Sequence, residues 1–259
     1  MEASLFSNLL EGLHNFDVAQ MNIVTLIQVV TWFLASAISF YFSIGNARVW
    51  TSIATGFFLI FVSQAFELNP YTFYAKMGPI HNLVGTISII LIAHGFLEYY
   101  IFSRTLEITG SKKAVYLTTL VMIALATLFV VINPTPSANV ARNIKIFENT
   151  IWIILAVFII DLLRKIYDVV RDSIIAKGFV LFGVVFAFIL LWKGSELYLQ
   201  IYQWDKDWLD IIAITGEEDP TIELYATRAN FALLMNQIFG LLSAFSVGGT
   251  FVYLYRLLR

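Results

Sequence analysis

The sequence predicts an all-α, polytopic membrane protein with seven transmembrane helices, folded as a single domain over residues 1–259. Hydrophobic residues make up 59% of the chain and charged residues only 13%, whereas a soluble domain carries about a quarter charged residues. The mean hydropathy is +0.79. The apolar residues also fall into separate segments, each long enough to cross a hydrocarbon layer of about 30 Å as a helix.

The seven predicted helices cover residues 22–42, 48–68, 79–103, 114–133, 147–163, 178–202 and 229–255. The fifth is the shortest, because the apolar run stops near Asp161. Most connections between the segments are short. We therefore expect consecutive helices to be antiparallel neighbours in one bundle.

The positions of the basic residues predict the orientation of the chain. One set of connections and ends holds ten basic residues: Arg48, Arg104, Lys112, Lys113, Arg164, Lys165, Arg171, Lys177, Arg256 and Arg259. The other set holds five: Lys76, Arg142, Lys145, Lys206 and Arg228. Since cytoplasmic loops are enriched in lysine and arginine, we expect the N-terminus outside and the C-terminus in the cytoplasm.

Three segments lie between or before the predicted spans. Residues 1–21 lack the basic start and cleavage site of a signal peptide and suit a helix at the outer membrane interface. Residues 203–228 form an outer acidic and aromatic loop, either a lid over a pocket or an amphipathic connector. Residues 162–177 alternate charges and are expected to extend the fifth helix into the cytoplasm.

A short internal repeat is visible in the predicted helices. HNLVGTIS in the third segment aligns with NQIFGLLS in the seventh, so that Gly85 matches Gly240 and Ser88 matches Ser243. SIATGF in the second segment aligns with IIAKGF at the start of the sixth. Small residues allow helices to approach closely, and we expect Gly85, Ser88, Gly240 and Ser243 to lie at helix contacts. The pattern indicates two parallel three-helix units joined by the fourth helix.

This parallel 3+1+3 plan resembles the sugar-transporting SWEET family and, more loosely, the rhodopsin-like sensors. The resemblance is one of layout. The chain contains no PQ dipeptide, and its last segment has no lysine that would carry retinal. The resemblance therefore implies a possible bundle plan and neither a sugar substrate nor a chromophore.

Polar residues from several predicted helices fall at the outer ends of the spans. The candidate ligand-binding residues are Glu67, His81, Asn82, Glu148, Lys193, Glu196, Asn236 and Gln237. Each unsatisfied polar group in hydrocarbon costs several kcal/mol, so these side chains are expected to face one another or water in an outward-facing polar pocket. The alternative is that some of them, such as Glu67, simply reach the lipid headgroups.

Lys193 and Glu196 are the most unusual of these residues, because they lie well inside the sixth apolar segment. Three residues apart on a helix, they are placed to pair directly. Ionisable groups in this setting indicate a functional site. Three interpretations of the pair remain open: a structural ion pair, part of a ligand site, or a proton-coupled group.

His94 and Glu98 lie one helical turn apart in the inner half of the third segment. Histidine titrates near neutral pH, so the two residues suit a proton relay toward the cytoplasm. A pair that packs this helix against a neighbour is the alternative.

Composition and motifs argue against several kinds of site. The chain has no cysteine, which excludes disulfides and thiolate metal centres. His81 and His94 stand about 140° apart around one helix and lack a histidine on another span, which disfavours haem. No enzymatic motif or basic aromatic patch is present, so we expect no cofactor, no metal and no nucleic-acid partner, and favour a protein without enzymatic activity.

Polar groups at one end and an apolar inner half favour a receptor or sensor-like protein that binds a small molecule from outside. A small-molecule transporter is the second hypothesis, and it requires a path past His94 and Glu98. The third is a non-catalytic or energy-transducing subunit of a larger membrane complex. We expect the lipid bilayer as surroundings, a protein partner or homo-oligomer, and a location in the plasma (inner) membrane.

Overall fold

A computed structural model describes residues 23–44, 48–68, 79–104, 112–132, 138–202 and 220–258. The helices are α2 (Ile23–Ser43), α3 (Arg48–Phe66), α5 (Ile80–Arg104), α6 (Lys112–Ile132), α7 (Ala138–Val170), α8 (Ala176–Ile201) and α10 (Pro220–Leu258). In these ranges seven helices are long and apolar enough to cross a membrane. This confirms, for the described residues, the predicted all-α class and seven helices of spanning length and composition.

Two helices are longer than predicted. Helix α7 begins nine residues before the predicted start at 147, because no glycine or proline interrupts 138–170 and helix formation does not require an apolar sequence. Its continuation to Val170 agrees with part of the expected extension of the fifth helix over 162–177. Helix α10 begins at Pro220, a residue favoured in the first helical turn, so the end of the predicted 203–228 loop is helical. The remainder of that loop and residues 1–21 lie outside the described residues.

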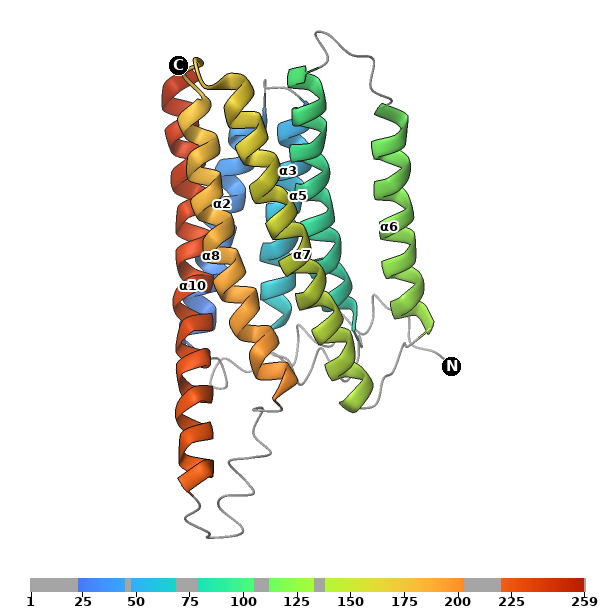
Figure 1. Cartoon of the computed structure of the whole chain (residues 1–259), viewed down its shortest axis with the longest axis vertical. Helices are drawn as coiled ribbons and strands as arrows, with labels where there is room; N and C mark the ends of the chain where they lie inside the picture. Colours follow the sequence, from blue (N-terminus) through green and yellow to red (C-terminus); the bar gives the residue numbers. More distant parts are fainter. Residues whose placement is uncertain are drawn as a thin grey trace, which may run out of the picture.

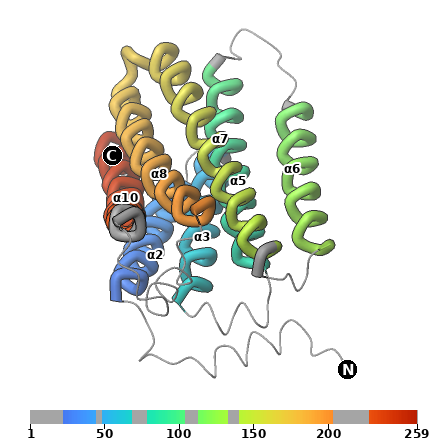
Figure 2. Tube along the Cα trace, turned by 60° about the horizontal axis from the view of Figure 1, so that its bottom comes forward, coloured from blue at the N-terminus to red at the C-terminus, as the bar shows by residue number. Residues whose placement is uncertain are grey.

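Six helices form a closed ring. Each packs against the next in the order α2, α3, α5, α7, α8 and α10, and α10 returns to α2. Figure 1 shows these helices side by side along the long axis of the molecule, and Figure 2 shows the same bundle turned toward its lower end. Consecutive helices are therefore neighbours around the ring with α6 as the exception, because α5 packs directly against α7. Helix α6 still meets α7 through the Phe129 and Phe147 rings, whose centres are 5.1 Å apart.

Helix α6 lies outside the ring. Its principal contact is with α5, and both views show it at the edge of the bundle. Only 11% of its spanning residues are buried, compared with 67% for α5. Its other faces carry exposed apolar side chains such as Leu120, Leu125 and Leu128, which suit contact with lipid.

The centre of the ring is aromatic and closely packed. Phe57, Phe96, Phe182 and Phe251 are buried, and their rings meet largely edge to face. Such pairs contribute about 0.5–1.5 kcal/mol beyond the area that they bury. In a membrane, tight packing of this kind replaces the hydrophobic effect as the force that holds helices together.

Glycines set how closely α3 and α5 approach. A Cβ atom on Gly56 would lie 2.7 Å from the carbonyl oxygen of Ser88, and one on Gly95 would lie 3.2 Å from the carbonyl oxygen of Val49. The two helices therefore touch backbone to backbone at two levels. This contact fixes the spacing of α3, which ends just before Glu67, and α5, which begins next to His81.

Candidate functional site

Lys193 and Glu196 form a buried ion pair on α8. Lys193 Nζ donates a hydrogen bond to Glu196 Oε2 over 2.7 Å, and the two side chains are 4% and 10% exposed. Lys193 Nζ also lies over two indole rings, 4.5 Å from the centre of Trp192 and 5.6 Å from that of Trp152. The predicted direct pairing of the two residues is confirmed, and a cation held over aromatic faces in a dry site is further stabilised.

Lys145, on α7, is a second partner of Glu196. Its Nζ lies 3.2 Å from Glu196 Oε1, so that one carboxylate bridges two ammonium groups from neighbouring helices. The sequence interpretation placed Lys145 in an outer connection and missed this role, because the fifth helix was expected to begin only at 147. The spacing of Lys145 and Glu148, at i and i+3, could have indicated that the two residues share a helix.

Glu67, which directly follows α3, and Glu148 on α7 lie within electrostatic range of both lysines and of Glu196. The five residues Glu67, Lys145, Glu148, Lys193 and Glu196 are called the charge cluster below. It contains three carboxyl groups and two ammonium groups. Glu67 accepts a hydrogen bond from Gln64 Nε2 over 3.3 Å, whereas the Glu148 side chain forms no ion pair with the described residues.

Glu148 occupies the space left by a glycine. A Cβ atom on Gly85 would clash with Glu148 Oε1 and lie 3.2 Å from Ser63 Oγ. Ser63 Oγ in turn donates a hydrogen bond to the carbonyl oxygen of His81 over 3.2 Å. His81 is buried and lies on α5, as Gly85 does. Helices α3, α5 and α7 therefore meet at this point through polar groups.

The matching glycine on α10 also faces a polar side chain. A Cβ atom on Gly240 would clash with Gln28 Nε2 from α2 and lie 3.1 Å from Trp192 Nε1. Ser88 and Ser243 are both fully buried. The prediction that Gly85, Ser88, Gly240 and Ser243 lie at helix contacts is therefore confirmed.

Of the remaining candidates, Asn82 is buried and lines a small cavity of about 10 Å³ among α5, α6 and α7. Asn236 Nδ2 donates to the carbonyl oxygen of Trp192 over 3.3 Å and so joins α10 to α8 beside the charge cluster. Gln237 is half-buried, and no hydrogen bond in the described part of the chain brings it to the cluster.

Three buried polar side chains near the cluster lack hydrogen-bond partners among the described residues. These are both polar atoms of the Asn149 amide and the indole Nε1 atoms of Trp32 and Trp152. Trp32 and Trp152 both pack against Trp192, with ring centres 5.8 and 6.3 Å away. Since buried polar groups are nearly always paired, each of these atoms calls for a partner from outside the described chain.

His94 and Glu98 belong to a different part of the fold. His94 Nδ1 lies 2.8 Å from Thr119 Oγ1, and Tyr116 Oη donates to Glu98 Oε1 over 2.6 Å, so the two residues attach α6 to α5. His94 Nε2 is 3.7 Å from Glu98 Oε2. His94 is about 20 Å along α5 from His81, far from the charge cluster.

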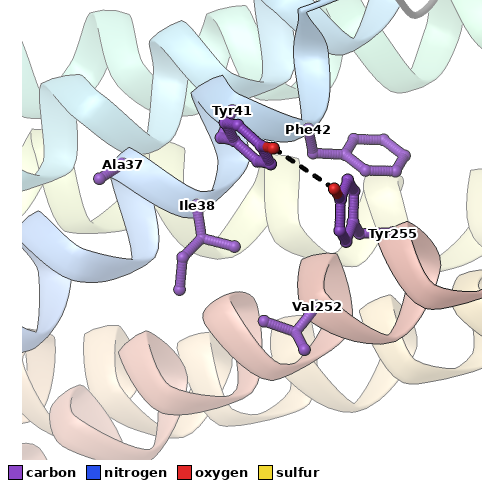
Figure 3. Close-up of a pocket in the computed structure, with 6 residues that line it drawn as sticks. All are labelled: Ala37, Ile38, Tyr41, Phe42, Val252 and Tyr255. Carbon is purple, nitrogen blue, oxygen red and sulfur yellow. Dashed lines mark hydrogen bonds between the residues drawn. The ribbon is translucent and has the colours of Figure 1, made fainter.

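A larger groove lies between α2 and α10, also far from the charge cluster. It has a volume of about 340 Å³ and an almost wholly apolar lining. Figure 3 shows the lining residues, with the Tyr41 and Tyr255 hydroxyl oxygens 3.3 Å apart across it. The groove therefore does not correspond to the polar pocket expected from the sequence.

No protein-family model, curated protein or solved structure matches this chain at a significant level. Within the described residues, no three histidine, aspartate or glutamate side chains converge as a metal site. The chemistry of the site therefore rests on the charge cluster and its neighbours: two cations, three carboxyl groups, an unpaired amide and three tryptophans.

Proposed function

We propose that this membrane protein is a receptor or sensor-like protein that binds a small polar molecule at the charge cluster. The observation that supports the proposal is a group of five ionisable side chains from three helices, packed among apolar spans, with unequal numbers of positive and negative groups. Charges inside a membrane are expensive and persist where function requires them. Glu67, His81, Glu148, Lys193 and Glu196 are the proposed ligand-binding residues.

The proposed orientation places the charge cluster at the outer end of the bundle and the C-terminus in the cytoplasm. It rests on the excess of lysine and arginine in the opposite set of connections and ends. With this orientation, Lys145, which is 27% exposed, lies on the side from which a ligand would arrive. The membrane proposed is the plasma (inner) membrane.

A transporter is the second candidate, and internal symmetry in the packing favours it. If α2, α3 and α5 correspond to α7, α8 and α10, every contact of the ring has a counterpart. Gln64 Nε2 donates to Glu67 at the end of α3 over 3.3 Å, as Lys193 does to Glu196 on α8 over 2.7 Å. Both pairs are three residues apart and lie near the same end of the bundle.

The aromatic core follows the same pairing of residues, which matches Phe57 with Phe186 and so differs by seven residues from the SIATGF–IIAKGF alignment, where Phe57 matches Phe179. Phe96 of α5 meets Phe186 of α8 with ring centres 5.8 Å apart and planes at 84°, and Phe251 of α10 meets Phe57 of α3 at 6.0 Å and 84°. This supports a parallel 3+1+3 repeat with α6 as the linking helix. Transporters built from repeats commonly bind substrate between the two halves, where the charge cluster lies.

A ligand screen on the purified full-length protein in mild detergent tests the proposal. A compound that binds the cluster should raise the melting temperature of the protein, and the rise should be lost in Glu196→Gln. Asp161→Asn, which removes an exposed carboxylate on α7, is the matched control and should respond like the wild type.

The same preparation separates the alternatives. Uptake of the stabilising compound into proteoliposomes would favour the transporter, and binding without uptake favours the receptor. If no compound stabilises the protein and other subunits copurify in fixed proportion, the receptor proposal fails. The exposed face of α6 would then suit a contact inside a larger membrane complex.

A further inference from the structure

We infer that the charge cluster accepts one additional positive charge at Glu148, supplied by a proton or by a small ammonium ligand. The inference rests on the proposed function and deepens it by naming the chemical class of the ligand. The charge cluster contains more carboxyl groups than ammonium groups. Glu67, Glu148 and Glu196 carry three negative charges when ionised, and Lys145 and Lys193 carry two positive charges.

Glu148 is the carboxyl group that this count leaves over. Glu196 is bridged by both lysines at 2.7 and 3.2 Å, and Glu67 is partly exposed and accepts a hydrogen bond from Gln64. The Glu148 residue is only 5% exposed, and its side chain forms no ion pair within the described part of the chain. A buried charge without a partner is strongly unfavourable, so a positive charge must come from elsewhere.

A second observation points to a ligand in the charge cluster. Lys145, Asn149 and Trp152 share one stripe of α7, at i, i+4 and i+7. Lys145 contacts Glu196 and Trp152 contacts Lys193, so Asn149 between them faces the same pair on α8. Asn149 is 0% exposed, and both its amide oxygen and its amide nitrogen lack a partner among the described residues.

The groups around Glu148 suit a small ammonium group. The amide oxygen of Asn149, the next residue of α7, is an available acceptor in the charge cluster, and the Trp192 face, which attracts cations, lies under the Lys193 ammonium group. A divalent metal is a poorer fit, because no three carboxylate or histidine side chains converge within the described residues.

Every helix that packs around Glu148 contributes to its charge environment. Glu67 comes from the end of α3, Lys193 and Glu196 come from α8, and Lys145 lies one turn earlier on α7 itself. His81 lies on α5 one turn before Gly85, the glycine that Glu148 covers. None of these groups other than the two lysines is a permanent cation near neutral pH, and both lysines are already committed to Glu196.

The first measurement is the melting temperature of the purified full-length protein from about pH 6 to about pH 9. If folding keeps a proton on Glu148 that the unfolded chain releases, the melting temperature falls as the pH rises. The fall should be several degrees in the wild type and in the control Asp161→Asn, and at most half as large in Glu148→Gln. Infrared spectra of the wild type should show a protonated carboxyl band that disappears over the same range.

The second measurement separates the two sources of charge. At the upper pH, methylammonium and ethylammonium are compared with methanol and ethanol, their neutral counterparts of similar size. An amine that raises the wild-type melting temperature, and not that of Glu148→Gln, identifies an ammonium site. A pH response that depends on Glu148, without an amine response, identifies the proton.

A wild-type melting temperature that responds neither to pH nor to amines overturns the inference, as does a Glu148→Gln variant that responds like the wild type. If Glu148→Gln does not fold, the infrared band of the wild type decides: its absence at every pH, without an amine response, overturns the inference. A neutral or anionic ligand found in the screen and dependent on Glu196 would leave the proposed function standing while this inference fails.

Discussion

Replacement of Lys193 by methionine should destabilise the protein more than any other single change in the charge cluster. The wild-type cluster has three carboxyl groups and two ammonium groups, and Lys193→Met leaves three against one. Lys193 Nζ is 2.7 Å from Glu196 and its side chain is 4% exposed, so the lost interaction is buried. Breaking a buried pair on one side costs about 3–5 kcal/mol.

The related variants give a definite order. Glu196→Gln leaves two carboxyl groups and two ammonium groups, so Lys145 and Lys193 keep counter-ions nearby and the loss should be smaller than for Lys193→Met. The double variant has two carboxyl groups and one ammonium group, so carboxyl groups again outnumber ammonium groups by one, as in the wild type. It should therefore recover part of the stability that Lys193→Met loses.

Thermal unfolding in mild detergent, followed by intrinsic tryptophan fluorescence, measures these effects. For a chain of this size 1 kcal/mol shifts the melting temperature by about 2–4 °C, so Lys193→Met should lower it by about 10 °C. The control is Lys165→Met, which removes an exposed lysine paired with Asp161 and should change stability by less than about 1 kcal/mol. A neutral Lys193→Met, or a double variant at least as unstable as the sum of the single variants, would refute the reasoning.

Three further predictions concern packing and topology. Gly85→Leu and Gly240→Leu should each lower the melting temperature by several degrees, because the added side chain displaces Glu148 or Gln28; unchanged melting in both would contradict the contact. Tyr116→Phe should loosen α6, so that the substitution speeds hydrogen exchange in 112–132 more than in α5. Equal exchange in the variant and the wild type would show that the hydroxyl does not hold the helix. Single cysteines introduced into this cysteine-free chain should react with an impermeant thiol reagent in intact cells at 203–219 and not at 105–111, and the reverse pattern would invert the proposed orientation.

The sequence alone was sufficient for the features that depend on local structure. A helix closes its hydrogen bonds within its own segment, so apolar length and composition determine the number of spans. The pairing of Lys193 with Glu196 follows from the same local geometry, because residues three apart lie on one face of any helix. The alignment of Gly85 with Gly240 likewise identified helix contacts, because small residues have a predictable use in packed spans.

Tertiary structure decided which of these faces meet. The exclusion of α6 from the ring, and the packing of α5 against α7, depend on side chains that interlock between segments far apart in sequence. Only that packing turned His94 and Glu98 toward Thr119 and Tyr116 on α6, rather than toward a path through the bundle. The sequence left both interpretations of this pair open, a proton relay and a packing contact, because helical spacing shows that two residues share a face and does not show which helix that face meets.

The same reason explains the charge cluster. Lys145 and Glu148 were visible in the sequence as polar residues before an apolar run, but the length of α7 and its rotation against α8 brought Lys145 to Glu196. Gly85 then determined where the Glu148 carboxyl group lies. Sequence determined how many charges enter the membrane region, and tertiary packing determined which of them are paired, since pairing depends on distances between helices that no local pattern encodes.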